Sequence, residues 1–556
     1  MRLFWAKVHI PLLKIVLAVK SLALRTKSQK PSDEMRENID LLFIHVPKFS
    51  GYYRPYGKYM TVNLLPMGTW ALADLAARRG YDTRILHLGL EWIETASFSA
   101  LPYLENKKIR VVAIPLHWHQ QTYNAIETAR EIKQARPEIF IVLGGYTASY
   151  FHREILGNFP QIDAVIRGDA ETPLPSLMEA LKWGKDLHTV PNLTWRDDAV
   201  IRENPLSYVA SAQDLEMASY ANLKLLKDGR AYMRLMGMPF VWSKGFSREK
   251  NRKHFHLGHN VFFLNTGRGC LGNCTWCGGG AMAQRRVNGR TGVIFRSPEK
   301  VVETAAEAVA LGYEMIHIAF DPGREAEKYY LELFSLIRKN GLRVKCYFES
   351  FSLPSDFFLQ AFAETFETAG SVIAISPESG DEQIRRHNKS FSFSNSALLK
   401  TISLAEQLRI RIDMFFSMGI PGETYSDLAR TAALRRRIRR SFKNIGRIWT
   451  SPIPMEPAAP WYCEPDAFGI VSERQSFADF FRASSPDGGG LGYYIPDFLG
   501  RDHNLNAVDF ERLLRKAKCR RHCSLHPNPN KTSSPFLGRL YCHYLNWATG
   551  RRPWIT

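Results

Sequence analysis

Three cysteines stand close together in the middle of this 556-residue chain, inside a glycine-rich run. Cys270, Cys274 and Cys277 have the spacing Cys-x3-Cys-x2-Cys, and no fourth cysteine lies nearby. Closed 4Fe–4S clusters are held by four cysteines, so three thiolates would leave one iron open. An open metal position can take a substrate. The pattern therefore predicts a tight loop around a cluster with one accessible iron.

Two other interpretations of the three cysteines remain open. They could belong to a zinc site completed by His256 or His259. Zinc sites favour two sets of paired cysteines, however, and there is only one set here. Buried thiols without a metal are the second alternative, but such thiols have no reason to lie in a glycine-rich turn.

The motif resembles that of the radical S-adenosylmethionine enzymes. The resemblance implies that Cys270, Cys274 and Cys277 hold a 4Fe–4S cluster whose open iron binds the amino and carboxylate groups of S-adenosylmethionine. An electron from the cluster then cleaves this molecule to a 5′-deoxyadenosyl radical in that family.

Length and composition indicate a globular protein of two or three domains. The chain is too long for one ordinary core, and its residues are 45% apolar and 23% charged. Eight cysteines in this length do not suggest a disulfide scaffold. Together with the cluster motif they indicate a reducing compartment, so we expect a cytoplasmic protein.

The net charge of +20 is concentrated in three segments. Residues 1–37 carry eight basic and three acidic side chains, 435–447 carry seven basic ones and 512–556 carry ten, the last two segments without any acid. Localised positive charge suits anionic lipid, nucleic acid or a phosphorylated substrate. For 435–447 a solvated helix face is an equally good explanation.

The N-terminal segment 1–37 is basic and apolar. Its apolar run after Pro11 is too short, and too interrupted by Lys14 and Lys20, to span a bilayer. A helix on a membrane surface is one interpretation, which would make the protein peripheral at the membrane. A helix packed on the body of the protein is the other. No other segment looks transmembrane.

Residues 38–185 alternate strand and helix patterns. Helices are expected from Pro66 to Gly80 and from Thr122 to Ala135. The expected strands are 41–46, 83–88, 111–116, 139–143 and 164–166. This alternation predicts a doubly wound, Rossmann-like parallel sheet, whose ligands bind at the carboxyl ends of the strands.

This first domain resembles the cobalamin-binding domain of cobalamin-dependent radical S-adenosylmethionine proteins. The resemblance rests on short turns in the same order ahead of the cysteines, and a purely structural Rossmann-type domain is the alternative. The implied cobalamin-binding residues are Pro66, Gly68, His117, Gly144, Gly145, Thr147, Arg167, Gly168 and Glu171. His117 follows the third strand and is a wall residue or, less readily, the lower ligand of cobalt.

Residues 186–260 are expected to form a connector without a clear period, and 261–460 repeat strand and helix patterns. Six strands are expected near 261–265, 314–320, 343–348, 371–375, 411–416 and 447–450. Six is the strand count of the partial (β/α)6, TIM-like barrel of radical S-adenosylmethionine enzymes. The basic C-terminal region 461–556 contains Cys463, Cys519, Cys523 and Cys542, whose role the sequence leaves open.

Further site residues follow from the same resemblance. The positions matching contacts to S-adenosylmethionine are Trp276, Asp321, Glu378, Ser379, Gly419 and Pro421. The family often has Gly-Gly-Glu after the second barrel strand, whereas this chain has Phe320-Asp-Pro-Gly-Arg324. Asp321 could still accept a hydrogen bond from the methionine ammonium. Ordinary turns with capping residues are the alternative for Glu378 and Gly419.

The resemblance implies an enzyme with a 4Fe–4S cluster, S-adenosylmethionine and cobalamin. Methylation of an unactivated carbon, or of phosphorus, in a small molecule is the expected reaction, with flavodoxin or ferredoxin as electron donor. Cyclisation, rearrangement or oxidation with the same cofactors is the alternative. A basic nucleic-acid-binding protein with a structural metal is a distant third, because no aromatic-rich recognition motif accompanies the basic runs.

Overall fold

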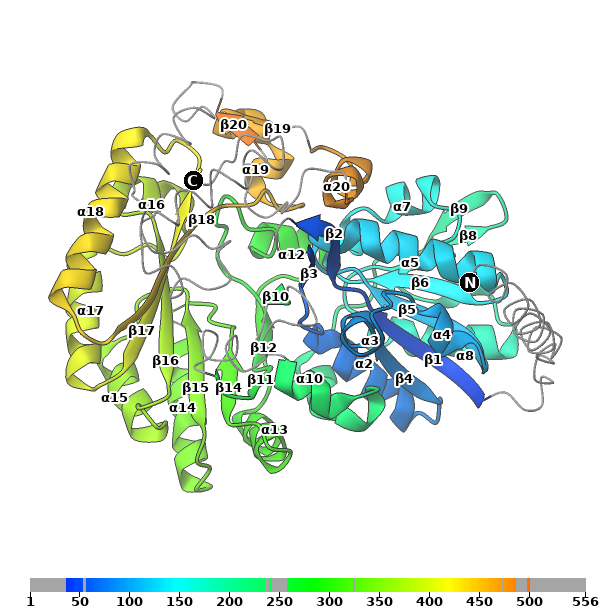
Figure 1. The fold of residues 1–556 in the computed structure, drawn as a ribbon, viewed down its shortest axis with the longest axis horizontal. Coiled ribbons are helices and arrows are strands. Elements are labelled where there is room, and N and C mark those ends of the chain that lie inside the picture. Colours follow the sequence, from blue (N-terminus) through cyan, green and yellow to red (C-terminus); the bar gives the residue numbers. More distant parts are fainter. Residues whose placement is uncertain are drawn as a thin grey trace, which may run out of the picture.

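Two α/β domains lie side by side in the computed structural model (Figure 1). The structure describes residues 37–53, 57–235, 240–241, 258–323, 326–472, 474–486 and 498–500. The N-terminal basic segment up to residue 36, the basic run 512–556 and Cys519, Cys523 and Cys542 lie outside the described residues. In the part of the chain that is described, no helix has both the length and the apolar character needed to cross a bilayer.

The first domain is built on a seven-stranded sheet with the order β4-β1-β5-β6-β7-β8-β9. Its strands are β1 (Glu37–His45), β4 (Thr83–His87), β5 (Lys107–Pro115), β6 (Phe140–Gly144), β7 (Ala164–Ile166), β8 (Leu193–Asp197) and β9 (Val200–Glu203). The first five pair in parallel, β8 adds antiparallel to β7, and β9 adds antiparallel to β8. The doubly wound parallel sheet predicted from the sequence is confirmed.

Alternate residues of the central strands pack into two different hydrophobic cores, one on each face of the sheet. Leu42 and Ile44 of β1 pack on the side of α5, whereas Leu41 and Phe43 pack on the side of α2 and α8. Both faces of a parallel sheet are buried in this way, which explains the nearly continuous apolar strands. The helices of this domain are α2 (Met67–Arg78), α3 (Leu88–Thr95), α4 (Leu101–Leu104), α5 (Thr122–Ala135), α6 (Tyr146–Tyr150), α7 (His152–Asn158) and α8 (Pro173–Trp183).

The segment expected to be a connector contains regular structure. β8 and β9, at residues 193–203, extend the first sheet. After them come the short helices α9 (Ala212–Glu216) and α10 (Gly229–Leu235), and the strand β10 (Phe240–Val241). β10 pairs with β3 (Gly57–Thr61), which pairs with β2 (Lys48–Tyr53) in a separate small sheet. These strands are two to six residues long, so the periodic signal that they give in the sequence is weak.

The second domain is a six-stranded, fully parallel sheet with the order β11-β14-β15-β16-β17-β18. Its strands are β11 (Val261–Phe263), β14 (Met315–Ile318), β15 (Lys345–Ser350), β16 (Val372–Glu378), β17 (Arg411–Met418) and β18 (Ile445–Pro452). β11 and β18 form the two edges of this order, so the barrel is partial, as predicted.

Helices cover the outer face of the partial barrel (Figure 1). They are α13 (Pro298–Ala310), α14 (Glu327–Lys339), α15 (Asp356–Thr365), α16 (Glu382–Asn388), α17 (Asn395–Gln407) and α18 (Tyr425–Ser441). The large core between strands and helices includes Phe334, Phe348 and Phe362. A smaller apolar group on the other face of the sheet includes Val261, Met315 and Tyr347. The basic run 435–447 covers the last turns of α18 and the start of β18.

The chain after the barrel returns to the first domain. It forms α19 (Pro460–Cys463), β19 (Ile470–Ser472), α20 (Phe477–Ser484) and β20 (Phe498–Gly500). Phe477 and Phe480 of α20 are buried in the core beside α5. The Ser484 hydroxyl lies 2.6 Å from the Thr122 hydroxyl at the start of α5. The C-terminal region therefore ties the end of the barrel to the first sheet.

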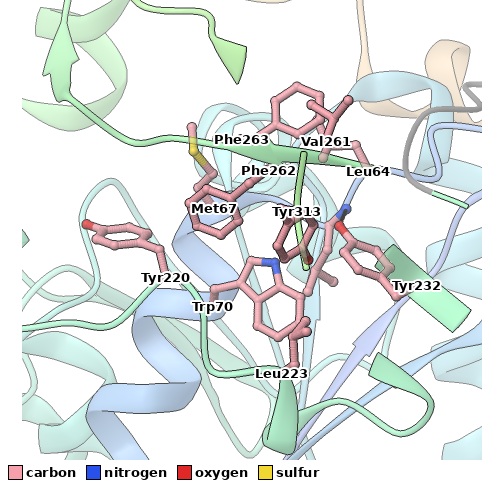
Figure 2. A pocket seen from close by; sticks show the side chains of 11 residues that line it. Leu64, Met67, Trp70, Tyr220, Leu223, Tyr232, Val261, Phe262, Phe263 and Tyr313 are labelled. Atoms are coloured by element: carbon pink, nitrogen blue, oxygen red, sulfur yellow. Dashed lines mark hydrogen bonds between the residues drawn. The ribbon is translucent and has the colours of Figure 1, made fainter. Parts of the chain in front are cut away.

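An aromatic cluster packs the two domains together next to α2 (Figure 2). Trp70 and Met67 of α2 meet Phe262 of β11 and Tyr313 from the barrel, with Tyr232 of α10 beside them. The space left among these side chains is about 20 Å³, room for roughly one water molecule. Tight packing of this kind favours a fixed arrangement of the two domains.

Candidate active site between the two domains

A cavity of about 520 Å³ opens where the carboxyl edge of the first sheet faces the barrel. Seven of the nine residues predicted to bind cobalamin line it: Pro66, Gly68, His117, Gly144, Gly145, Gly168 and Glu171. The barrel contributes Phe263, Asn265, Gly267, Arg268, Gly269, Ala319 and Phe320. Both domains therefore supply walls to one cavity, at the edge where open α/β sheets bind ligands.

Glycines shape the wall on the side of the first sheet. Gly145 has φ +93°, and a Cβ there would lie 3.0 Å from the Leu116 carbonyl oxygen, so a larger residue would be strained. Gly68, in the first turn of α2, has no neighbouring atom within 4 Å of its absent Cβ. Because Gly68 lines the cavity, the missing side chain leaves that space to a ligand.

His117 follows β5 and forms part of the cavity wall. Its ring packs edge-on against Trp118 at 4.7 Å, and the Tyr146 ring lies 6.3 Å away. Surrounding protein atoms lower the pKa of His117 to about 4 by desolvation, although its side chain is exposed where it lines the cavity. The imidazole is thus neutral at physiological pH and offers a free nitrogen lone pair.

Thr147 and Arg167 are not among the residues that line the cavity. The Thr147 hydroxyl donates to the carbonyl oxygen of His117 at 2.9 Å. Arg167 pairs with Glu203 of β9 at 2.7 Å and donates to the Asn204 carbonyl. Both side chains hold neighbouring loops in place. The sequence could not indicate the partner of Arg167, because Glu203 lies 36 positions later in a segment without a period.

The cysteine loop begins at β12 (Gly267–Gly269), which pairs with β13 (Val293–Phe295) and is followed after the loop by α12 (Ala281–Asn288). The three thiols are unpaired and partly exposed. The Gly272 N–H donates to Cys270 Sγ, and the Gly279 N–H donates to Cys277 Sγ, each at 3.3 Å. Burial raises the pKa of both thiols, while these N–H groups act in the opposite direction. A metal ion binds the deprotonated sulfur, so metal coordination would oppose this rise in the thiol pKa.

Segments far along the chain hold this loop. A Cβ on Gly278 would lie 2.5 Å from the Pro457 carbonyl oxygen, so only glycine fits. The Gly278 N–H donates to Glu456 at 2.8 Å, and the Trp461 N–H of α19 donates to the Thr275 carbonyl at 3.1 Å. Trp276 packs into an apolar group that contains Trp461. The loop is therefore fixed by the chain that follows β18.

Asp321, after β14, organises neighbouring loops. Its carboxylate accepts hydrogen bonds from the N–H groups of Gly323 (3.1 Å), Phe351 (2.7 Å) and Ser352 (3.4 Å), and from the Ser350 hydroxyl (3.2 Å). Burial raises the pKa of this carboxyl, although these donors act against the rise. The side chain therefore joins the loops after β14 and β15.

The remaining predicted residues lie at the ends of β16 and β17. Glu378 has φ +63° and accepts a hydrogen bond from the Ser417 hydroxyl of β17. Ser379 is fully buried, and its hydroxyl accepts from the Asp381 N–H at 3.1 Å. Gly419 donates its N–H to Glu423 at 2.8 Å, and the Pro421 carbonyl accepts from Asn388 at 3.0 Å. A non-glycine residue with positive φ, such as Glu378 at the end of β16, is typical of functional turns.

Lys389 was not predicted from the sequence. It follows α16 and is buried, and its Nζ donates to the carbonyl oxygen of Ser376 in β16. Burial lowers the pKa of Lys389, whereas the nearby Glu378 carboxylate and Cys274 thiol act to raise it. The lysine therefore places a cation between the cysteine loop and the end of β16. The only signal in the sequence was its position shortly after Glu378.

Glu423, in the turn after β17, is buried with one oxygen unpaired among the described residues. Burial raises its pKa to about 8, although the N–H groups of Gly419 and Ile420 oppose this rise. The folded protein thus keeps a proton that the unfolded chain, with a pKa of about 4.3, releases as pH rises. The free energy of unfolding should therefore fall between about pH 5 and pH 8.

We expect Glu423→Gln to remove this fall of the unfolding free energy with pH, because the amide mimics the protonated acid. As pH rises through this range, the free energy of unfolding of the variant should increase relative to that of the wild type by up to about 1.4 kcal/mol for each pH unit. Urea unfolding at pH 5, 6, 7 and 8 measures it, with the exposed Glu364 of α15 changed to Gln as control. Parallel stability curves for wild type and Glu423→Gln would contradict the raised pKa.

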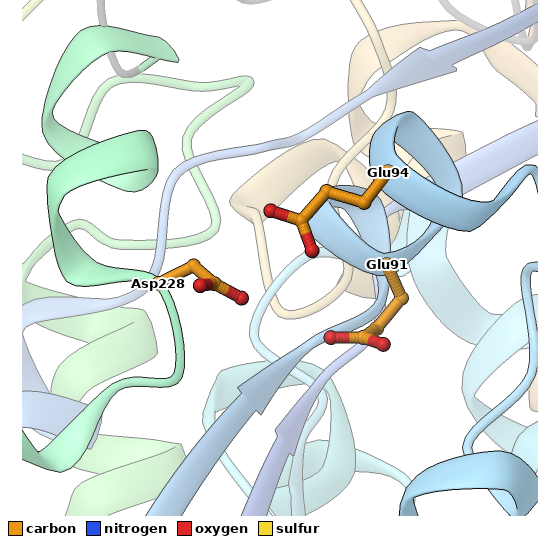
Figure 3. A group of neighbouring side chains, drawn as sticks. All are labelled: Glu91, Glu94 and Asp228. Carbon is orange, nitrogen blue, oxygen red and sulfur yellow. The ribbon is translucent and has the colours of Figure 1, made fainter.

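A group of acidic side chains lies elsewhere in the first domain (Figure 3). Carboxylate oxygens of Glu91, Glu94 and Asp228 lie within 4.8 Å of one another. Lys227 is 2.6 Å from Glu91 and compensates part of their charge. None of the three lines the cavity between the domains. We therefore assign no ligand to this group.

Comparisons with known proteins agree with this architecture. Residues 56–178 match the B12 binding domain, and residues 264–434 match the radical SAM superfamily. An uncharacterised methyltransferase of Pyrococcus horikoshii is 25% identical over 250 residues, which cover 45% of this chain and 46% of the relative. The hopanoid C-3 methylase of Methylococcus capsulatus is 29% identical over 133 residues, covering 24% of this chain and 25% of the relative. The matches thus span less than half of each relative.

A solved structure shares the fold over nearly the whole length. It is the radical S-adenosylmethionine methyltransferase TsrM from Kitasatospora setae, with cobalamin and a [4Fe-4S] cluster bound. The TM-score is 0.61 at 14% sequence identity, covering 94% of this chain and 97% of that one. A B12-binding domain followed by a domain of the radical SAM superfamily is thus present in this chain.

Proposed function

We propose that this protein is a methyltransferase that uses a 4Fe–4S cluster, S-adenosylmethionine and cobalamin to methylate an unactivated carbon, or phosphorus, of a small molecule. One observation carries the proposal. The cavity lined by Gly144 and Gly145 at the first sheet is also lined by Gly267–Gly269, which lead directly into Cys270. A substrate in this cavity would lie between the two cofactors.

The cavity suits cobalamin, whose corrin ring carries amide side chains. Asn265 lines the cavity, is 6% exposed, and its Oδ1 has no hydrogen-bond partner among the described residues. The buried hydroxyl of Tyr146, which also lines the cavity, is unpartnered in the same sense. Buried polar atoms are normally satisfied, so these two atoms call for a ligand with polar groups. The corrin amides would supply donors to Asn265.

The cysteine loop suits a cluster with one open iron. Cys270, Cys274 and Cys277 would be its ligands, since thiolates are the usual ligands of such clusters. Residues of the cysteine loop and of the ends of β16 and β17 would hold S-adenosylmethionine. They are Trp276, Glu378, Ser379, Gly419 and Pro421. Asp321 would act indirectly, through the loops it joins. Lys389 would hold the methionine carboxylate, because a buried ammonium favours an anionic partner.

When bound, the cluster supplies an electron that cleaves S-adenosylmethionine to a radical, and cobalamin carries the methyl group. The protein's own residues bind and orient these groups and exclude water. An external one-electron donor of the flavodoxin or ferredoxin type is needed to reduce the cluster.

Anaerobic reconstitution tests the proposal. The chain is loaded with iron, sulfide and hydroxocobalamin, then given S-adenosylmethionine and a reductant. We expect both S-adenosylhomocysteine, from methylation of cobalamin, and 5′-deoxyadenosine, from radical formation. When a candidate small-molecule substrate is added as well, a product heavier than that substrate by one methylene unit identifies methylation. Deoxyadenosine without S-adenosylhomocysteine would contradict methyl transfer and favour cyclisation or another radical outcome.

A further inference from the structure

Four charged side chains meet at the boundary between the two domains, beside the cavity. Asp169 and Glu171 belong to the loop after β7, Arg268 to β12, and Arg290 follows α12. Arg268 Nη1 lies 2.6 Å from Asp169 Oδ1, and its Nη2 lies 2.7 Å from Glu171 Oε1. Arg290 binds the other oxygen of Asp169. We call these four residues the interdomain ion cluster.

The interdomain ion cluster is secluded from solvent. The side chains of Asp169, Glu171 and Arg290 are 5%, 4% and 3% exposed, and that of Arg268 is 21% exposed. Asp169 also accepts the Ala210 N–H at 3.0 Å, and Arg290 donates to the Ala210 carbonyl at 2.8 Å. Two acids and two guanidinium groups give zero net charge, which permits burial. Burial raises the pKa of Asp169, but Arg268 and Arg290 more than offset this and lower it overall.

The four residues lie in or next to the loop after β7 and the cysteine loop, the two loops proposed to contact the cofactors. Arg268 stands two positions before Cys270, within a strand pair that fixes its backbone. Asp169 follows Gly168, whose absent Cβ would lie 3.2 Å from the Asn288 Cα of α12. Asp169, Glu171 and Arg268 all line the cavity. The ion pairs of Arg268 therefore join the B12-binding domain directly to the strand that leads into the cysteine loop.

We propose that Arg268, held in a fork between Asp169 and Glu171, is a positioning residue that sets the separation and orientation of the cysteine loop relative to the cobalamin cavity. This inference rests on the proposed function, because the two loops matter together only if both cofactors bind. A planar guanidinium that donates from two nitrogens to two carboxylates fixes both direction and distance. An ammonium in its place can keep the charge but not the fork.

Two measurements test this role, with a matched control. Glu171→Gln removes the negative charge from one arm of the fork, whereas Glu203→Gln removes the negative charge from a partner of Arg167 at the same 2.7 Å distance within the first domain. In the chain before cofactor loading, amide hydrogen exchange should become faster in both 167–171 and 267–270 for Glu171→Gln. For Glu203→Gln the second loop should exchange as in the wild type. This first measurement does not depend on the proposed function.

The second measurement uses the loaded, reduced enzyme, in which cob(II)alamin and the reduced cluster are both paramagnetic. A nearby cluster speeds relaxation of the cob(II)alamin signal, so its microwave power saturation reports their separation. We expect Glu171→Gln to bind both cofactors, because the amide keeps the size and polarity of this side chain in the cavity wall. The variant should saturate at lower power than the wild type and lose about tenfold to 100-fold in methyl transfer. Arg268→Lys, which keeps the charge and hence the fold, should show the same changes.

The inference is wrong if Glu171→Gln and Arg268→Lys match Glu203→Gln in exchange at 267–270 and in power saturation. Failure of the proposed function looks different, because the wild type itself would then lack a cobalamin or cluster signal. If Glu171→Gln does not fold, Arg268→Lys decides the question alone: unchanged saturation overturns the positioning role, and lower saturation power supports it.

Discussion

Cys274→Ser is expected to lose the iron–sulfur cluster and all turnover with S-adenosylmethionine. A serine hydroxyl remains protonated near neutral pH and is a poor ligand for the iron of such clusters, which are held by thiolates. With two ligands left, iron and sulfide should fall from about four of each per chain to below one. Anaerobic iron and sulfide analysis, the brown absorption band and 5′-deoxyadenosine formation measure the loss.

Two other cysteines provide controls for this experiment. Cys346 is buried in β15 and Cys463 ends α19, where Arg286 Nη1 lies 2.6 Å from its sulfur. We expect Cys346→Ala and Cys463→Ala to keep iron and sulfide at the wild-type level. Iron retention and full turnover after replacement of Cys270, Cys274 and Cys277 together would refute a cluster on these thiols.

Gly68→Trp is expected to weaken cobalamin binding while leaving the cluster intact. Gly68 lies in the first turn of α2 and lines the cavity, and its absent Cβ has no atom within 4 Å, so a side chain can start from this position toward the cavity. Tryptophan is also a better helix residue than glycine, which should keep the fold stable. Cobalamin affinity should fall at least about tenfold, or 1.4 kcal/mol. Cobalamin absorbance after gel filtration and equilibrium titration measures this.

Gly157→Trp is the matched control for this substitution. Gly157 lies in α7, is exposed, and likewise has no atom within 4 Å of its absent Cβ, but it does not line the cavity. Its variant should bind cobalamin as the wild type does. Equal cobalamin binding by Gly68→Trp would show that cobalamin does not occupy this cavity, even if the cluster and its chemistry persist.

Local pattern was enough to predict the framework of both domains. The strands expected at 111–116 and 164–166 became β5 and β7, and the helix expected from Thr122 to Ala135 is α5. Apolar runs bounded by turn residues mark buried parallel strands, and strand–helix alternation then leaves few possible topologies. Because carboxyl ends of parallel strands share one edge, the turns with Gly68, His117 and Gly145 were expected to meet, and they do.

Contacts between residues far apart in the chain could not be predicted from the sequence. Glu171 and Arg167 both stand in one short turn, yet Glu171 faces Arg268 in the other domain while Arg167 faces Glu203 of β9. Likewise Asp321 joins two barrel loops, and α20 packs on the first domain through Phe480. The cysteine spacing, the alternation of strands and helices and the glycine turns were determined by the sequence alone, because each depends on neighbouring residues. Which charge pairs with which was decided only by the tertiary structure, because Coulomb and hydrogen-bond partners are chosen by distance in space.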